Sequence, residues 1–410
     1  MTRTHLRRAL AAVLLLGALL PSSAQTFSGT LQSGWGWFYN SSDLAAAGPQ
    51  FDAKVAGNVG AAEAPAGQYS IGFQAKLLPG GQTSFALADA WVKAYLGPAD
   101  VSVGNQTIAW GVTDVFTPLD VVNPRDMSHP LDSVKIPVPS GRVLLTGSGL
   151  SLDLVLVPAF AKGVVPEARW QPATTLTPPT GVTIVSRTLV DQVPALIWDN
   201  LAWGGRAGAS LDVFQGVDFG VTFYQGRNPL PRATVTLASA GTPGQMKATS
   251  TLDYDRFLLA GADAVVALEG LVLRTEAAGR LWRDTDPQNP VAGDATAQGV
   301  ASLEYTLPVI GVKAIAEGVV DWTNTAGYEG TAKAKAVLAL SAAPDSRWSW
   351  KAVSAWDFDG AGMVSPQLTY TVADGLSATL AGFAFLGDTA VTWGSWNNNS
   401  VVEATFKYAF

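Results

Sequence analysis

Hydrophobic and polar residues alternate along most of the chain after residue 24. The last ten residues are the clearest case, because Phe406, Tyr408 and Phe410 share one face with small apolar residues while Glu403 and Lys407 lie on the other. Side chains alternate between the two faces of a β-strand, so this pattern predicts an amphipathic strand. An amphipathic helix would repeat every 3.6 residues, and none of the alternating segments does.

The same period of two recurs in segments of about ten residues, separated by connections of two kinds. Tight connections such as LGPAD, LEGL and ADGLS alternate with long polar ones at residues 40–50, 112–141, 159–205, 283–298, 322–330 and 387–400. Short turns on one side and long loops on the other are typical of outer-membrane barrels. We therefore predict an all-β fold, a single antiparallel up-and-down barrel of about 18 strands (range about 16–20), with one or two strands in residues 234–268.

Composition supports a membrane barrel over a soluble one. Only 14% of the residues are charged and 48% are hydrophobic, whereas about 25% charged residues is usual for a soluble domain. No run after residue 24 approaches the roughly 18 apolar residues of a membrane helix. A closed barrel with an apolar exterior satisfies both observations, because it pairs every backbone group inside the bilayer.

The first 24 residues predict a secretory signal peptide. Arg3, Arg7 and Arg8 precede an apolar run at residues 9–20, and Ser22 and Ala24 provide small residues for cleavage. The run is too short to span a bilayer. We therefore expect residues 25–410 to form one barrel domain in the outer membrane of a Gram-negative-type bacterium.

Charge and residue content exclude several functions. Without the three signal-peptide arginines, 23 basic residues face 33 acidic ones, a net charge of −10 that argues against nucleic-acid binding. Cysteine is absent, and His129 is the single histidine after residue 24, so we expect no disulfides, no multi-histidine metal site and no cofactor. A hydrolase using His129 with nearby carboxylates stays open as an alternative.

Residues 112–141 combine five nearby prolines with a dense set of charges. Prolines at 118, 124, 130, 137 and 139 remove backbone donors and are expected to prevent a regular ladder after a strand that ends at Trp110-Gly111. A loop of this length is usually functional or disordered. We predict that it folds into the lumen as a constriction whose charged residues are Asp114, Asp120, Arg125, Asp126, His129, Lys135 and Arg142.

The polar face of the later strands is expected to line the lumen. Including Asp263 and Asp321, it carries eight positive and six negative residues, a bias too small to predict anion selectivity. A mixed, charged interior holds water in a barrel of this size. The residues predicted to face the lumen are Arg274, Glu276, Arg280, Glu304, Lys313, Glu317, Lys333, Lys335, Arg347, Lys351, Glu403 and Lys407.

One segment of about forty residues carries a dense and ordered motif. Its residues are Asp89-Ala90-Trp91-Val92, Val103-Gly104, Gln106, Ile108, Trp110-Gly111, Asp114, Phe116, Pro118, Asp120 and Asn123-Pro124-Arg125-Asp126. This segment resembles the pattern VGRQxIxWGxxDxFNPxDxxNPRD, after a strand of the type REAYV, of a family of Gram-negative outer-membrane barrels that are similar to porins and to alginate-export-type channels. Asn105 departs from the pattern, because the family has arginine there, which puts a cationic role at this position in doubt.

The resemblance implies an outer-membrane channel and no established catalysis. Our leading hypothesis is a porin-like channel that passes small or medium polar solutes. The alternatives are a non-conducting structural, receptor or adhesin barrel and the enzyme based on His129. We expect contacts with outer-membrane lipid and recognition of the last strand, through Phe406, Tyr408 and Phe410, by the outer-membrane assembly machinery. The sequence does not indicate the solute or the oligomeric state.

Overall fold

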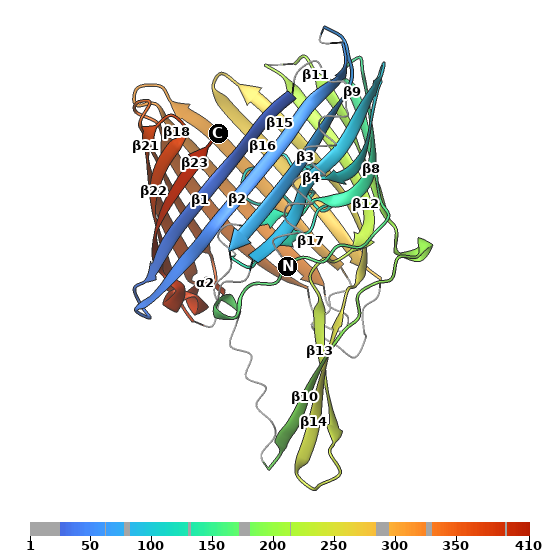
Figure 1. The fold of residues 1–410 in the computed structure, drawn as a ribbon, viewed down its shortest axis with the longest axis vertical. Helices are drawn as coiled ribbons and strands as arrows, with labels where there is room; N and C mark the ends of the chain where they lie inside the picture. Colours follow the sequence, from blue (N-terminus) through green and yellow to red (C-terminus); the bar gives the residue numbers. More distant parts are fainter. Residues whose placement is uncertain are drawn as a thin grey trace.

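The computed structural model places eighteen antiparallel strands in one closed barrel (Figure 1). It describes residues 25–410 except 62, 78–82, 130–132, 172–180, 214, 284–294, 325–329 and 390–391, so the predicted signal peptide lies outside the described residues. The barrel closes because the first strand, β1, pairs with the last, β23. The predicted single antiparallel barrel of about 18 strands is confirmed.

The barrel strands follow one another around the wall in chain order. They are β1 (Gln25–Phe38), β2 (Asp43–Gly60), β3 (Pro65–Leu77), β4 (Thr83–Leu96), β5 (Ala99–Gln106), β8 (Val138–Gly147), β9 (Leu150–Val157), β11 (Ala202–Leu211), β12 (Val217–Arg227), β15 (Arg256–Leu268), β16 (Leu271–Trp282), β17 (Ala295–Leu307), β18 (Val312–Asn324), β19 (Thr331–Ala342), β20 (Trp348–Asp357), β21 (Ala361–Ala373), β22 (Leu376–Gly387) and β23 (Val401–Ala409).

The two ends of the barrel differ in the length of their connections. At the end that holds Gln25 and Phe410, here called the turn end, the connections β4–β5, β8–β9, β15–β16 and β21–β22 are tight turns. The long connections after β5, β9 and β12 all leave the opposite end, here called the loop end. This asymmetry is the one expected for an outer-membrane barrel.

The outer face of the wall is apolar and exposed. Trp35 and Leu380 are 53% and 54% exposed, and Leu31, Val221 and Phe406 lie on the same outer face. The last strand is joined to the first through its aromatic end, where the Phe410 N–H donates to the Gly29 carbonyl oxygen at 3.0 Å. Apolar side chains in this position are stable only against lipid, which explains the low charge content.

Reversing the polarity of this face should destabilise the barrel. Leu380→Arg, near the middle of β22, is expected to lower the free energy of unfolding by about 2–4 kcal/mol, because the guanidinium enters the hydrocarbon region. Thr379→Arg provides the control, since the Thr379 hydroxyl lies on the inner face, 2.9 Å from that of Thr369. Urea unfolding in liposomes measures the free energy of unfolding of both variants. An equal loss of this free energy in Leu380→Arg and Thr379→Arg would contradict the assignment of the two faces.

Three strands form a separate sheet, here called the stalk, that stands away from the barrel beyond the loop end (Figure 1). They are β10 (Thr183–Asp191), β13 (Arg232–Ser239) and β14 (Gln245–Asp253), with β10 parallel to β14. At its base, Asp191 accepts hydrogen bonds from Lys162 at 2.8 Å and from Tyr254 at 3.0 Å. Burial, followed by the contact with Asp191, raises the pKa of Tyr254 to about 12.

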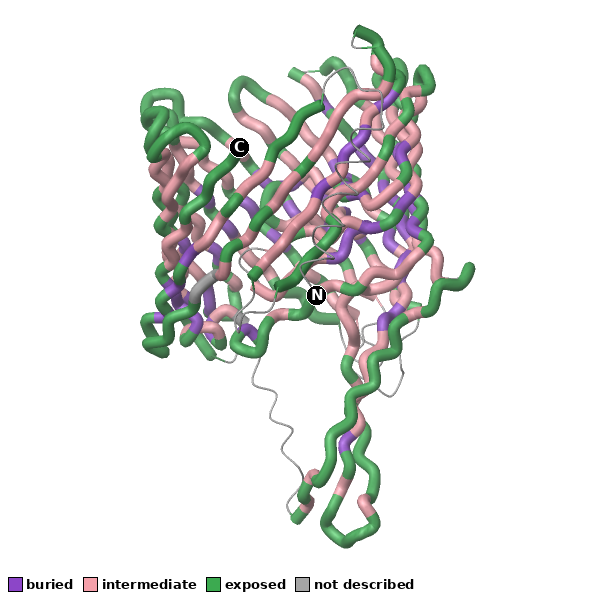
Figure 2. The backbone as a smooth tube through the Cα atoms, in the orientation of Figure 1, coloured by how far each residue is buried: buried purple, intermediate pink, exposed green. Residues whose placement is uncertain are grey.

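The remaining short elements lie at or inside the loop end. They are β6 (Arg125–Asp126), β7 (Val134–Lys135), α2 (Thr392–Ser395) and the 3-10 helices η2 (Ala168–Trp170), η3 (Trp198–Asn200) and η4 (Asn397–Asn399). Trp170 is buried against Phe385 and Trp396, so aromatic packing joins η2 to the end of β22. Most of the stalk is exposed, and nearly all buried residues belong to the barrel (Figure 2). Among the described residues, no helix has the length and apolarity needed to cross a membrane.

Three expectations about connections were wrong. Residues 40–50 are not a long loop, because a tight turn ends at Ser42 and β2 begins at Asp43; a register shift of β1 against β2 accommodates Gly48-Pro49. Residues 234–268 contain three strands, of which only β15 belongs to the barrel. The 159–205 connection is not only a loop, because its Ile, Val and Thr residues form β10, which pairs with β14.

The boundaries predicted for the loop at 112–141 were also wrong. The strand before it ends at Gln106, well before Trp110-Gly111, and β8 already begins at Val138. Pro139 fits inside β8 because the strand pairs there with β5 alone, and the ladder to β9 starts only at Gly141. The missing N–H of Pro139 therefore costs no ladder hydrogen bond on that side.

Candidate functional site

The described residues between 107 and 137, here called the inner loop, run through the interior of the barrel. Inner-loop groups contact Asp153 on β9, Glu276 on β16, Glu317 on β18 and Glu403 on β23. These strands lie on widely separated parts of the wall, and only a segment inside the barrel can reach all of them. The face of the wall that these carboxylates share is therefore the lumen face.

Asn123 turns the chain into the lumen directly after β5. Its Oδ1 accepts from the Ile108 N–H at 2.7 Å, and its Nδ2 donates to the carbonyl oxygens of Gln106 at 3.0 Å and Ile136 at 2.9 Å. One buried amide thus satisfies backbone groups from both ends of the inner loop. This is why β5 ends at Gln106 although its residues would allow a longer strand.

Removing this amide should weaken the barrel measurably. Asn123→Ala leaves three backbone groups without their partners, and each buried unsatisfied group costs about 1–3 kcal/mol. We expect a loss of at least about 2 kcal/mol in the free energy of unfolding, measured in liposomes with urea. Asn58, on the lumen face of β2, provides the matched control, because Asn58→Ala should change the free energy of unfolding by less than about 0.5 kcal/mol. Equal losses in the two variants would contradict the role of Asn123.

The apolar residues of the inner loop pack on one part of the wall. Ile108, Trp110 and Leu119 are fully or nearly fully buried against a cluster that includes Val155 and Leu259. The indole N–H of Trp110 donates to Asp153 at 2.8 Å, so its polar atom is satisfied within the cluster. The inner loop therefore adheres to the β8–β16 side of the lumen, and the opposite side is not covered by this cluster.

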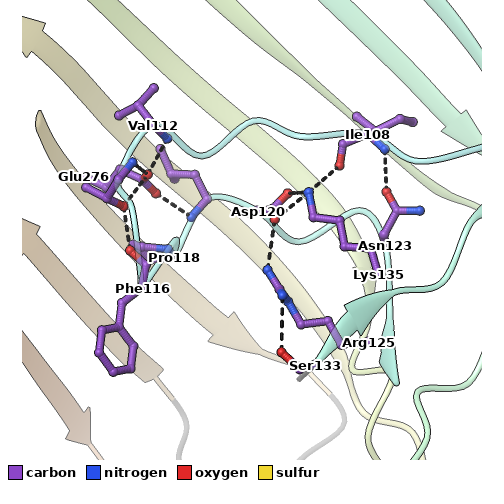
Figure 3. A network of polar contacts seen from close by, with 12 residues as sticks. Ile108, Val112, Phe116, Pro118, Asp120, Asn123, Arg125, Ser133, Lys135 and Glu276 are labelled. Carbon is purple, nitrogen blue, oxygen red and sulfur yellow. Dashed lines mark hydrogen bonds and ion pairs between the residues drawn. The ribbon is translucent and has the colours of Figure 1, made fainter. Parts of the chain in front are cut away.

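Glu276 holds both ends of the segment 112–119, here called the loop tip (Figure 3). Its Oε1 accepts from the N–H groups of Val112 at 2.5 Å and Thr113 at 2.7 Å and from the Thr113 hydroxyl at 2.6 Å. Its Oε2 accepts from the Leu119 N–H at 3.1 Å. Hydrogen bonds to an ionised carboxylate are stronger than neutral ones, so this buried glutamate fixes the loop tip.

Glu317 holds the middle of the loop tip from the neighbouring part of the wall. It accepts from three consecutive N–H groups, those of Asp114 at 3.2 Å, Val115 at 3.2 Å and Phe116 at 2.7 Å. Consecutive N–H groups that converge on one point form an anion-binding concavity. The two glutamates together replace the ladder that a strand would give this segment.

Asp114 joins the loop tip to the charged wall of β16 and β17. Its carboxylate lies 3.1 Å from Arg274 and accepts from the Ser302 hydroxyl at 3.0 Å. Arg274 also pairs with Glu304 at 2.9 Å, and Glu304 pairs with Lys313 at 2.7 Å. The charges alternate in sign along this chain of contacts, so they largely neutralise one another.

Asp120 stabilises the inner loop internally. Its Oδ2 lies 2.6 Å from Lys135 and 3.2 Å from Arg125, and Lys135 also donates to the Ile108 carbonyl oxygen at 3.1 Å (Figure 3). Because Arg125 and Lys135 pair across the β6–β7 ladder, one aspartate contacts both cations. Asp120, Arg125 and Lys135 therefore hold the loop together.

His129 and Asp126 lie at the far side of the inner loop. The Nε2 of His129 is 3.6 Å from Glu403, and its ring meets that of Trp170 at a centroid distance of 5.2 Å. Asp126 accepts from the Ser128 N–H at 3.0 Å, the local turn chemistry of an aspartate. In the described part of the chain, the contacts of His129 are thus a carboxylate and an aromatic ring, and the enzyme alternative stays a prediction.

Arg142 binds an aspartate that the sequence analysis did not single out. It donates from Nε and Nη2 to the two carboxylate oxygens of Asp153, at 2.8 Å and 2.7 Å. Asp153 also accepts from Trp110, so Arg142 acts on the inner loop through this carboxylate. The alternation of Asp153 with the apolar residues of LSLDLVLV is the only sequence signal for it.

Ladder partners show which strand residues share the lumen face, because directly opposite residues point to the same side. Arg280 donates to the Pro118 carbonyl oxygen at 3.3 Å, and the Lys335 ammonium lies 5.7 Å from the Phe116 ring. Arg347 lies in the turn before β20, 3.5 Å from the Tyr370 hydroxyl. The residues on the lumen face are Arg274, Glu276, Arg280, Glu304, Lys313, Glu317, Lys333, Lys335, Lys351, Glu403 and Lys407.

A hollow of about 430 Å³ lies on the lumen face near the turn end. Polar side chains at its lining include Lys313, Ser341, Lys351, Gln367 and Thr369. Within the described part of the chain, no carboxylate lies within 4.0 Å of Lys351. The polar part of the hollow therefore carries hydroxyl groups and the positive charge of Lys351.

Cations without a carboxylate partner extend beyond this hollow. Of the described lumen residues, Lys76 and Lys407 also have no carboxylate within 4.0 Å of their ammonium groups. They belong to one row across β23, β1, β2 and β3, with Gln32 and Gln50 between them. This row lies away from the apolar cluster on the β8–β16 side, and the inner loop reaches its first strand, β23, at Glu403. Among the described residues, no group of three or more His, Cys, Asp or Glu is arranged to hold a metal ion.

Comparison with known proteins gives structural neighbours only. No family model and no curated protein matches the sequence. Three solved outer-membrane proteins of Pseudomonas aeruginosa are similar in fold. OccK2 (OpdF) is 10% identical, with a TM-score of 0.56, and the match covers 95% of this chain and 98% of that one. The protein opdK is 11% identical, with a TM-score of 0.55 and coverages of 95% and 99%, and OccK11 (OpdR) is 11% identical, with a TM-score of 0.50 and coverages of 94% and 96%. The chain thus has a porin-like outer-membrane barrel fold; a relation to alginate-export-type channels stays a prediction.

Proposed function

We propose that this barrel is a water-filled channel of the outer membrane that passes small or medium polar solutes, with the inner loop as its constriction. The observation that carries the proposal is the capture of the loop tip by Glu276 and Glu317, through six backbone N–H groups and one hydroxyl. A loop held this way extends across the lumen and would narrow it at a fixed place.

The orientation of the channel follows from its two ends. The turn end holds both ends of the barrel sequence and the tight turns, which is the periplasmic arrangement of bacterial barrels. The loop end, with the stalk and the aromatic packing around Trp170, then faces the exterior. Solutes enter at the loop end, pass the inner loop and leave beside the hollow at Lys351.

The free lumen wall favours hydroxylated anions among the polar solutes. Lys76, Lys351 and Lys407 supply positive charge, while Gln367, Thr369 and their neighbours supply hydrogen bonds to hydroxyl groups. One of the similar structures, OccK2, was solved in complex with glucuronate, a hydroxylated carboxylate. We extend this solute class to the present channel on the strength of its own lysines.

Liposome swelling tests the channel proposal. Vesicles containing the folded barrel should swell in isotonic solutions of sugars and sugar acids, at rates that fall as the solute grows, because the inner loop limits the width. Empty vesicles provide the background. A correctly folded barrel that gives no swelling with even the smallest sugar would contradict the proposal and favour a non-conducting barrel.

The stalk supports a second candidate function, attachment of a partner outside the cell. Its sheet has two outer strands, β10 and β13, whose free edges face away from β14. A barrel whose β13–β14 hairpin is replaced by a short Gly/Ser turn should keep its full swelling rate, since the stalk lies outside the wall. If swelling instead disappears while the barrel stays folded, the division between channel and stalk is wrong.

A further inference from the structure

A highly exposed apolar segment of three adjacent residues lies outside the barrel wall, between the stalk and β11. Leu196, Ile197 and Trp198 are 74%, 52% and 87% exposed, in a stretch here called the rim hook, residues 194–200. In Figure 1 the chain between β10 and β11 extends sideways from the wall, near the end of β12. Three adjacent large apolar side chains at such exposure indicate a surface that meets an apolar partner.

The rim hook is held in shape by its own polar groups. The Asn200 side chain donates from Nδ2 to the Ala195 carbonyl oxygen at 2.6 Å, and the N–H groups of Asn200 and Leu201 donate to the carbonyl oxygens of Ile197 at 3.0 Å and Trp198 at 3.3 Å. Backbone groups that are satisfied within the segment lower the cost of taking it into an apolar phase. The apolar side chains are left on the outside.

Asn200 also joins the rim hook to the barrel. Its Oδ1 accepts from Arg227 at 3.2 Å from Nε and 2.8 Å from Nη2, and Arg227 is the last residue of β12. Arg227 and Asn200 also border a small cavity that Val122 and Tyr224 line from the lumen side. These hydrogen bonds fix the rim hook at the loop end of β12, and from there the chain extends sideways away from the wall (Figure 1).

The apolar outer face of the barrel continues directly into the rim hook. Trp203 and Phe223 are outer-face neighbours on β11 and β12, with ring centroids 5.4 Å apart. Trp203 follows Trp198 by five residues, and both are exposed. Tryptophan is enriched where a membrane meets water, because its ring is apolar and its N–H is polar. Because the rim hook continues the lipid-facing surface of the wall, its apolar side chains are expected to contact lipid.

We propose that Leu196, Ile197 and Trp198 insert into the outer leaflet beside β11 and β12 as a lateral membrane anchor. The rim hook lies on one side of the barrel only, so it binds lipid at one edge and fixes how the loop end sits in the membrane. The connection from β10 passes through it, and the anchor therefore also holds the base of the stalk against the bilayer surface. This inference does not depend on channel activity.

Site-specific labelling tests the anchor, and the absence of native cysteine makes the labelling clean. Trp198→Cys carries an NBD fluorophore in liposomes that contain doxyl-labelled lipid. Leu380→Cys on the outer face is the lipid-exposed reference, and Thr236→Cys on the stalk is the water-exposed one. We expect quenching at position 198 of at least roughly half that at position 380, because an interfacial anchor lies within reach of the acyl chains.

Two results would overturn the anchor. One is quenching at position 198 no greater than at position 236. The other is efficient disulfide cross-linking between two Trp198→Cys copies in the membrane without lipid quenching, which would identify a second copy of the chain as the partner. All labelled proteins are first checked for folding by their heat-modifiable migration, and Leu196→Cys replaces any Trp198→Cys preparation that does not fold. The same two comparisons then apply to position 196.

Discussion

A barrel carrying Glu276→Ala and Glu317→Ala is expected to conduct roughly twofold or more ion current per channel than the wild type, because the loop tip leaves its place in the lumen. Seven donors lose their acceptors in this variant. A hydrogen bond to a charged group contributes about 1.5–3 kcal/mol, so losing even two of them shifts the equilibrium between held and released loop tip by roughly a hundredfold or more.

Single-channel recording in planar bilayers measures this change. Asp52→Ala is the matched control, because Asp52 is a lumen carboxylate that accepts from Thr30, Gln50 and Gln74 and touches no inner-loop residue among those described. The control should conduct like the wild type. Broader and noisier current levels in the double variant would fit a mobile loop tip, whereas unchanged current with both variants folded would show that the loop tip does not limit conduction.

Reversing three lumen charges is expected to reverse the ion preference of the channel. In Lys76→Glu, Lys351→Glu and Lys407→Glu combined, the free wall becomes negative, and the ratio of anion to cation permeability should fall by about tenfold or more. The wild type should favour anions, since these lysines have no carboxylate within 4.0 Å in the described part of the chain. The reversal potential in a KCl gradient measures the ratio of anion to cation permeability for the wild type and for the triple variant.

Lys247→Glu on the stalk separates lumen charge from overall charge. It lies in β14, outside the barrel wall, and should leave the reversal potential unchanged. An anion preference that survives the triple reversal would show that ions follow another path. The expectation of anion preference changes the sequence interpretation, in which the lumen charges seemed almost balanced. The structure pairs Arg274, Lys313 and Lys335 with carboxylates and leaves Lys351 and Lys407 without one.

The barrel itself was predictable because its signal is distributed over the whole chain. Each strand of the wall has lipid on one side and water on the other, so a period of two is imposed on segments such as 301–307 and 401–410. An error in one strand does not remove the pattern from the others. The number of strands and the polarity of the two faces follow from this repetition.

Local exceptions were not predictable from the same pattern. The stalk strand β13 alternates as barrel strands do, and only its pairing with β14 separates it from the wall. The early end of β5 depends on Asn123, seventeen residues further along the chain, whose side chain takes the backbone groups that a longer strand would pair. Such contacts depend on tertiary structure and leave no periodic trace.

The loop charges were predicted as a set, but their individual roles were not. Asp114 and Asp120 are both aspartates beside proline-rich sequence, yet one contacts the wall at Arg274 and the other neutralises Lys135 within the loop. Glu276 and Glu317 were expected only to line the lumen. Their hydrogen bonds to backbone N–H groups could not be predicted, because every residue offers the same N–H and the sequence does not say which of them lacks a partner.

The most direct test of the account places a single cysteine at Val115, in the loop tip, where the side chain is exposed. Open single channels of Val115→Cys are recorded in a planar bilayer while a charged, membrane-impermeant thiol reagent is added. The account predicts stepwise ion currents before the addition and a clear fall in each step after it, because the reagent enters a water-filled lumen and narrows it beside the loop tip. Steps that stay unchanged despite complete modification, or a folded barrel with no current at all, would contradict it.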